Sequence, residues 1–118
     1  RRQRQMCIRD RHILELTNRI SKGIRVFSDR YADFLEKDRE FDKAYARAYL
    51  MAEGSIKDKE KQSVLETFEA RTARDVAEVA YKSADKLLKA LDSELRAWQS
   101  ISASVRQQYA VAGRGEGA

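Results

Sequence analysis

The sequence predicts an all-α protein in which two long helices fold back on each other as an antiparallel hairpin. The 118 residues include no proline, which would interrupt a helix interior, and glycine occurs only twice before residue 111, as Gly23 and Gly54. Charged residues make up 36% of the chain and are mixed in sign, as in solvated helices with many i,i+4 pairs. Apolar residues recur at helical spacing, and no segment shows the alternation with period two that indicates a strand.

The first helix is predicted over residues 12–52. Its apolar residues are spaced by about 3.5 positions on average, which is typical of a helix that packs along a seam. They are Ile13, Leu16, Ile20, Ile24, Phe27, Tyr31, Phe34, Phe41, Tyr45, Ala48 and Ala52. Asp38 fills one position of this stripe, and it is interpreted either as a buried polar group that sets the register or as a residue at the edge of the seam.

A turn is predicted at residues 53–55, where the apolar pattern stops. Gly54 can adopt the left-handed conformation that ends a helix. Ser55 is a favourable N-cap, and Asp58 three residues later completes the pattern of a capping box. A second helix is therefore expected to begin directly after Ser55.

The second helix is predicted over residues 56–110, with apolar positions about 3.7 residues apart. They are Leu65, Phe68, Thr72, Val76, Val79, Ser83, Leu87, Leu91, Leu95, Trp98, Ile101, Val105 and Tyr109. The serines of segment 100–104 make it the favoured place for a bend, because serine competes for backbone hydrogen bonds. The glycine-rich segment 111–118 is predicted to be a flexible tail.

The two predicted helices differ in length, so the start of the first helix is expected to lie opposite Arg96 of the second, and the residues after Arg96 extend beyond it. Two helices alone also bury little surface, and stable bundles usually have three or four. We therefore expect a homo-oligomer whose contacts are Trp98, Ile101, Val105 and Tyr109. The alternatives are that this overhang folds back on its own chain or packs on an N-terminal piece absent from the sequence.

Segment 1–11 lacks the periodicity of the rest and resembles translated sequencing-adapter read-through. We predict that it is not native; the alternative is a disordered basic arm. It holds five arginines and one aspartate, so the remainder has 19 basic and 18 acidic residues, a net charge of +1. The basic balance of the chain is then no argument for nucleic-acid binding. Cys7, the only cysteine, also lies in this segment.

The residues that would support catalysis are sparse. His12 is the only histidine and has no second histidine or cysteine with which to share a metal ion. No glycine-rich phosphate loop or nucleophile elbow is present, and an extended hairpin offers few pockets. No apolar run approaches the roughly 20 residues that cross a bilayer. We expect a protein that is not an enzyme, has no cofactor and does not enter a membrane.

Basic residues flank the predicted turn and give two interpretations. Arg39, Lys43 and Arg47 share one face of the first helix, and residues 57, 59 and 61 are all lysines. Tyr45 and Tyr49 are nearby and could stack on bases, as in single-strand binders, although Tyr45 also belongs to the seam. The alternative is an ordinary charged surface, because acidic residues are interspersed.

Two stretches of the chain resemble small bacteriophage proteins of the UvsY type. One is Asp42-Lys-Ala-Tyr-Ala-Arg-Ala-Tyr-Leu-Met-Ala-Glu-Gly-Ser55 with the Lys/Glu-rich segment after it, and the other is Ala80-Tyr-Lys-Ser-Ala-Asp-Lys-Leu-Leu-Lys-Ala-Leu-Asp-Ser-Glu-Leu-Arg-Ala-Trp98 with Ser-Val-Arg106 beyond it. The resemblance covers roughly residues 24–109 and rests on pattern and helix order.

The resemblance implies a recombination mediator in the cytoplasm of a bacterial host. Such proteins are ring-like homo-oligomers that bind single-stranded DNA, help to displace the single-strand-binding protein and load a RecA-like recombinase. Carried over by position, the DNA contacts would be Lys43, Arg47, Lys57, Lys59, Lys61, Lys82 and Arg106. The near-zero net charge of residues 12–118 departs from this expectation. The alternative is a structural or adaptor hairpin, such as a phage assembly or scaffold protein, that binds no nucleic acid.

Overall fold

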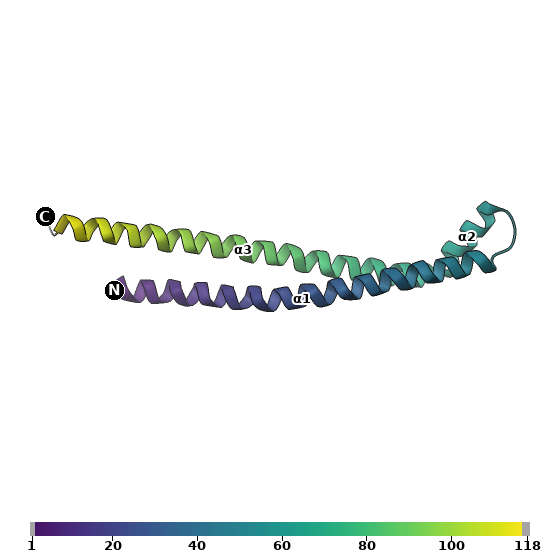
Figure 1. Ribbon diagram of the computed structural model, residues 1–118, viewed down its shortest axis with the longest axis horizontal. Helices are drawn as coiled ribbons and strands as arrows, with labels where there is room; N and C mark the ends of the chain where they lie inside the picture. The colour runs from purple at the N-terminus through teal and green to yellow at the C-terminus, as the bar shows by residue number, and fades with distance from the viewer. Residues whose placement is uncertain (1, 117–118) are drawn as a thin grey trace. The chain divides into compact units, whose positions relative to one another are not determined.

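The computed structural model describes residues 2–116 of the chain and the side chains of residues 7–112. It contains three helices, α1 (Arg2–Met51), α2 (Ile56–Glu66) and α3 (Phe68–Glu116), labelled in Figure 1. No strand occurs within the described residues, so the predicted all-α class is confirmed.

The helix bounds differ from the predicted ones at several places. Helix α1 begins at Arg2 and so includes segment 2–11, whose foreign origin stays a prediction. Helix α3 is not interrupted at 100–104 and continues to Glu116, past the predicted end at 110. Residues 117–118 of the predicted tail lie outside the described part. Within residues 2–116, no helix has an apolar stretch long enough to cross a membrane.

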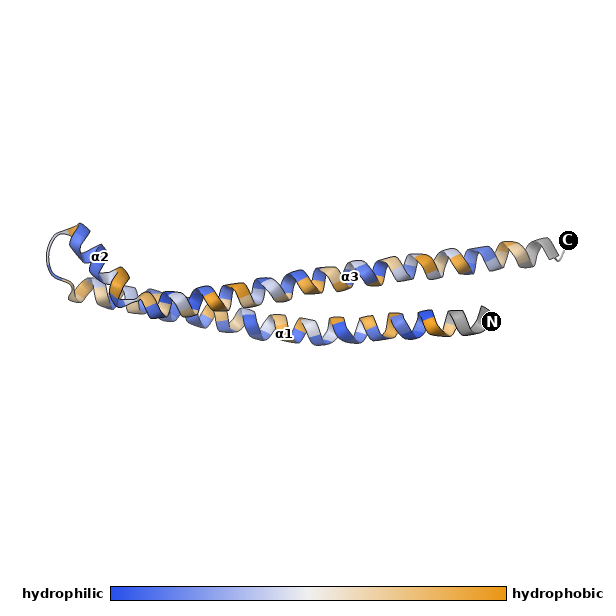
Figure 2. Ribbon diagram, turned by 180° about the vertical axis from the view of Figure 1, so that it is seen from behind, coloured by the Kyte–Doolittle hydropathy of each residue, from blue (hydrophilic) through white to orange (hydrophobic). Residues whose placement is uncertain are grey.

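Contacts divide the chain into two compact units. Unit 1 comprises Arg1–Ile24 and Lys86–Ala118, and unit 2 comprises Arg25–Asp85. Each unit contains a part of α1 and a part of α3, and unit 2 also contains all of α2. Figure 2 shows apolar residues recurring among polar ones along α1 and α3, as expected for helices with one packed face.

The connection between α1 and α2 is the predicted glycine turn. Gly54 has φ 110°, and a Cβ there would lie 2.9 Å from Oδ2 of Asp58, so both conformation and space require glycine. The Asp58 backbone N–H donates to Oγ of Ser55, and the Ser55 N–H donates to the Asp58 carboxylate, each at 3.2 Å. The predicted glycine conformation and capping box are confirmed.

The second predicted helix is divided at Thr67 instead of bending at 100–104. Oγ1 of Thr67 donates to the Ser63 carbonyl at 2.6 Å, and Oγ of Ser63 donates to the Lys59 carbonyl at 2.7 Å. Hydroxyl bonds to the carbonyl four residues back compete with the helical ladder and bend helices. Ser63 and Thr67 are both buried, so their hydroxyls cannot turn to water.

Aromatic side chains of α1 pack around a tyrosine of α3 in unit 2. The rings of Phe27, Tyr31 and Phe34 surround Tyr81 of α3, with centroid distances of 6.2, 5.0 and 5.0 Å. Aromatic contacts of this kind contribute about 0.5–1.5 kcal/mol each beyond the area they bury. This cluster fixes α3 against α1 within the unit.

The face that α2 and α3 turn toward α1 in unit 2 is not the predicted one. The large apolar residues of the predicted stripe are 64–77% exposed; these are Leu65, Phe68, Val76 and Val79. The buried residues are small instead: Ser63, Thr67, Ala77 and Ala84. Because the aromatic rings of α1 and Tyr81 of α3 fill much of the space between the helices, a close-packed interface favours small residues at the other facing positions.

An ion pair joins α1 and α3 in unit 2. Oδ1 of Asp38 lies 2.8 Å from Nε of Arg74, and each side chain is about a third exposed. The Arg74 guanidinium also lies over the Phe41 ring, 5.5 Å from its centroid. Asp38 is thus a half-buried polar group of the seam that contacts one defined position of α3. The sequence pattern did not indicate Arg74 as the partner of Asp38.

Unit 1 combines the start of α1 with the later part of α3. Leu16 is fully buried, and a Cβ at Gly23 would lie 2.6 Å from Cδ2 of Leu88, so the two helices approach closely there. The rings of His12 and Trp98 meet edge to face at 4.6 Å. The premise that Trp98 extends beyond the end of α1 is therefore wrong, because α1 begins before His12.

Replacing Gly54 by alanine should lower the free energy of unfolding by about 1–2 kcal/mol, since the substituted residue must keep a positive φ beside Asp58. Chemical denaturation followed by circular dichroism, at one fixed protein concentration, measures the change. Glu53→Ala, at the exposed neighbouring position, is the control and should change stability by less than about 0.5 kcal/mol. Equal stability of the two variants would contradict the role of Gly54.

Exchanging the charges of Asp38 and Arg74 tests the ion pair between them. Asp38→Arg and Arg74→Asp should each destabilise the protein by about 1–2 kcal/mol, and the double swap should recover about 1 kcal/mol of the summed loss. The recovery should shrink at high salt, because both groups are partly exposed. Asp42→Arg, on the exposed side of α1, is the control for the charge change. Strict additivity of the two single variants would show that Asp38 and Arg74 do not interact.

Candidate nucleic-acid interface

Four of the seven predicted DNA contacts are exposed around the turn in unit 2. Lys43 and Arg47 lie near the end of α1, and Lys57 and Lys61 lie in the first two turns of α2. Within residues 7–112, none of the four forms an ion pair with a carboxylate. The nearby Asp58 carboxylate is engaged in the cap of α2. These four cations are therefore available to phosphate oxygens.

The four cations do not share one face. Lys43 and Arg47 each lie two residues from Tyr45, and Lys57 and Lys61 each lie two residues from Lys59. A step of two residues rotates a helical side chain by about 200°. Because Tyr45 and Lys59 belong to the interface between the helices, the cations lie on the outer sides of α1 and α2. A single strand contacts both pairs only by passing around the turn.

Lys59 differs from its neighbours because it is half-buried in that interface. Its Nζ lies 5.9 Å from the centroid of the Tyr49 ring, a cation–π contact. Tyr45 and Tyr49 are also half-buried, and their rings stack on each other with a centroid distance of 6.5 Å. The surfaces of these rings are thus partly occupied, which limits the predicted stacking on bases.

The remaining two predicted contacts are already engaged. Nζ of Lys82 donates to Oε1 of Glu78 at 2.7 Å. This hydrogen bond and the attraction between the charges hold the pKa of Glu78 below its ordinary value and raise the pKa of Lys82. Nε of Arg106 donates to the Ser102 carbonyl at 3.3 Å. Arg106 belongs to unit 1, whereas the other six predicted contacts belong to unit 2.

The predicted oligomer contacts all belong to unit 1. Trp98, Val105 and Tyr109 are half-buried, and Ile101 is 44% exposed. His12, which packs on Trp98, also lies 3.5 Å from the carboxylate of Glu94 through Nε2. Trp98 is thus partly covered by its own chain, which leaves less of it for a second copy.

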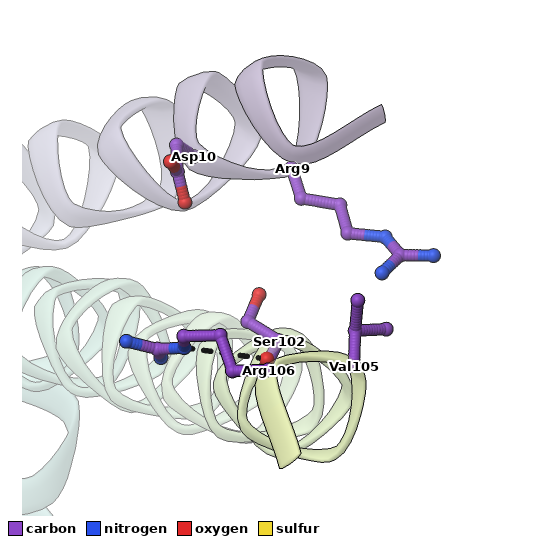
Figure 3. Close-up of a pocket in the computed structure, with 5 residues that line it drawn as sticks. All are labelled: Arg9, Asp10, Ser102, Val105 and Arg106. Carbon is purple, nitrogen blue, oxygen red and sulfur yellow. Dashed lines mark hydrogen bonds between the residues drawn. The ribbon is translucent and has the colours of Figure 1, made fainter. Parts of the chain in front are cut away.

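A hollow of about 150 Å³ lies between α1 and α3 in unit 1. Figure 3 shows Arg9 on α1 and Arg106 and Val105 on α3 at its edges. Asp10 and Ser102 complete the lining, and the buried Ser102 hydroxyl has no hydrogen-bond partner in the described structure. Arg9 and Asp10 lie in segment 1–11, which is predicted to be foreign, so the hollow receives no functional assignment.

The described residues contain no group of three histidine, cysteine, aspartate or glutamate side chains that could hold a metal ion. Comparison of the chain with protein-family models, with curated proteins and with solved structures finds no match.

Proposed function

We propose that this protein is a non-enzymatic recombination mediator that binds single-stranded DNA as a homo-oligomer. The observation that carries the proposal is a set of exposed cations around the turn that have no carboxylate partner among residues 7–112, namely Lys43, Arg47, Lys57 and Lys61. They lie within or next to segment 42–55, one of the two stretches that resemble UvsY-type proteins. Binding would be electrostatic and independent of base sequence.

The proposed subunit is an antiparallel helical hairpin. In unit 2, the contact partners of α1 recede along the chain as α1 advances. They are Arg30 with the carbonyl of Ala80, Asp38 with Arg74, and Tyr49 with Lys59. In unit 1, His12 contacts Trp98 and Gly23 adjoins Leu88, which follows the same opposite order. These contacts support the hairpin, in which the turn between α1 and α2 carries the cations.

Four cations on one subunit give modest affinity, since the chain without segment 1–11 carries a net charge of only +1. An oligomer repeats the cations, and contacts linked in this way act at high effective concentration. Displacement of a single-strand-binding protein and loading of a RecA-like recombinase, in the cytoplasm of a bacterial host, are the activities that the resemblance adds to this binding.

The second candidate function is a structural or adaptor hairpin that binds no nucleic acid. It is favoured by the distribution of the cations over opposite sides of α1 and α2, and by the half-buried state of Tyr45 and Tyr49. A surface that evolved for one DNA strand would more commonly gather its cations and aromatic rings in one groove. Binding of an oligonucleotide distinguishes the two functions.

Reversing two charges tests the DNA-binding surface. Lys57→Glu with Lys61→Glu should weaken binding of a fluorescent single-stranded oligonucleotide by about tenfold or more at low salt. It should also reduce the slope of log affinity against log salt by about 1.4, since two phosphate contacts are lost. The titration should use a chain that starts at His12, so that the arginines of segment 1–11 cannot bind DNA themselves.

Lys22→Glu with Lys86→Glu reverses two exposed lysines of unit 1 and serves as the matched control. It makes the same change in net charge away from the turn, so it should reduce affinity by less than about threefold. Absence of oligonucleotide binding by the oligomeric protein at low salt would exclude the mediator function and leave the adaptor function. Equal losses in both double variants would place the DNA elsewhere.

A further inference from the structure

An exposed apolar row follows the outer side of α2 and α3 in unit 2. We call the outer row the six residues Leu65, Phe68, Thr72, Val76, Val79 and Ser83. Its four large members are 64–77% exposed, and neither α1 nor any other described part of unit 2 covers them. We propose that the outer row is the contact surface for a second copy of this chain. The inference rests on the proposed self-association and is independent of DNA binding.

The spacing of the outer row indicates that its occupant is another helix. Leu65 recurs as Val76 after 11 residues, Phe68 as Val79, and Thr72 as Ser83, so two large residues and one small hydroxyl residue repeat together. Eleven residues in three turns give about 3.67 residues per turn, close to the 3.6 of a straight helix. Within α3 the row therefore stays on one side from Phe68 to Ser83, over about 22 Å, and Leu65 adds to it from α2 across the division at Thr67. A narrow row of that length fits the side of a second helix better than a small ligand.

Polar groups on the outer row do not oppose its burial. Oγ1 of Thr72 donates to the Phe68 carbonyl at 2.9 Å, so this hydroxyl keeps a partner when water is excluded. Val76, Val79 and Thr72, with Asp75, also line a shallow depression of about 280 Å³ at the middle of the row. Asp75 is exposed, so its carboxylate remains in contact with water. The row thus has an apolar centre and a polar margin, the arrangement of specific protein interfaces.

The exposed area of the chain is large enough to include a contact with a second copy. The chain exposes 9527 Å², whereas a compact monomer of 13.6 kDa exposes about 6,600 Å². The excess is well above the roughly 800 Å² that each partner buries in a standard interface. The four large side chains of the outer row supply roughly 100 Å² each, so the rows of two copies with their margins approach the roughly 1,000 Å² of a specific contact.

The second copy is the simplest occupant because the row is complementary to itself. In a two-fold contact the same surface of both subunits meets, so each apolar residue of one row finds apolar residues in the other. Such a contact buries eight large side chains at once. This places one interface between copies on unit 2, whereas the sequence analysis placed it at Trp98 to Tyr109 in unit 1.

A charge in the outer row tests the inference in the full chain without DNA. Val76→Glu should raise the dissociation constant of self-association by about 100-fold or more, because the contact would bury two unpaired carboxylates. Sedimentation equilibrium measures the constant. Ala73→Glu places the same charge on the same helix at an exposed position outside the row, and it should change the constant by less than about threefold. Val79→Gln, a milder change, should raise it about tenfold while circular dichroism at high concentration stays helical.

Three results would overturn the inference. Equal self-association of the wild type, Val76→Glu and Val79→Gln would show that the copies meet elsewhere, with self-association itself intact. Equal weakening by Ala73→Glu and Val76→Glu would show an effect of charge rather than of the row. A wild-type chain that is monomeric at all concentrations would refute both the proposed interface at the outer row and the proposed oligomer. The oligonucleotide titration tests DNA binding separately.

Discussion

The structure of unit 2 depends on a difference in side-chain size across its interhelical interface. Helix α1 contributes aromatic rings, and the opposite side consists of small residues with Tyr81 and Arg74 between them. With these side chains in place, a close-packed interface favours small residues at its remaining positions, so four large apolar residues of α2 and α3 face outward. The buried Ser63 and Thr67 belong to the same small face, and the division between α2 and α3 falls at Thr67. The difference in side-chain size therefore accounts for the exposed outer row.

Features set by local chemistry could be predicted from the sequence, and the choice of packed face could not. Gly54, Ser55 and Asp58 determine the turn within five residues, so their roles follow from the sequence without any knowledge of packing. The face of α3 was ambiguous because two rows in unit 2 have helical spacing, one large and apolar, the other small. Hydrophobicity favours burial of the large row, but it does not say whether that row is buried against α1 of the same chain or against another molecule. Arg74 was missed for a related reason, because it lies on the face with the small residues, which was not the predicted packed face. Only Asp38, in the apolar stripe of α1, indicated a partner on the other helix.

Self-association through the outer row would repeat the cations around the turn, which connects it with the proposed DNA binding. Lys57 and Lys61 lie on the outer side of α2, just before Leu65 begins the row. Copies that meet along the row would join several sets of these cations in one assembly. The weak binding expected of one subunit would then become strong through repetition, without any further change in sequence. The adaptor function would use the same interface and differ only in what the turn contacts.

The rate of thiol labelling measures which side of α3 faces α1. In a chain with Cys7→Ser, a cysteine is introduced by Val76→Cys or by Ala77→Cys, and labelling is followed in dilute and concentrated protein. The cysteine at position 76 should react at least about tenfold faster than the one at position 77 in dilute protein, because Ala77 is buried against α1. High protein concentration should slow labelling at position 76 alone. Faster labelling at position 77 than at position 76 would show that α3 faces α1 with its large apolar row instead.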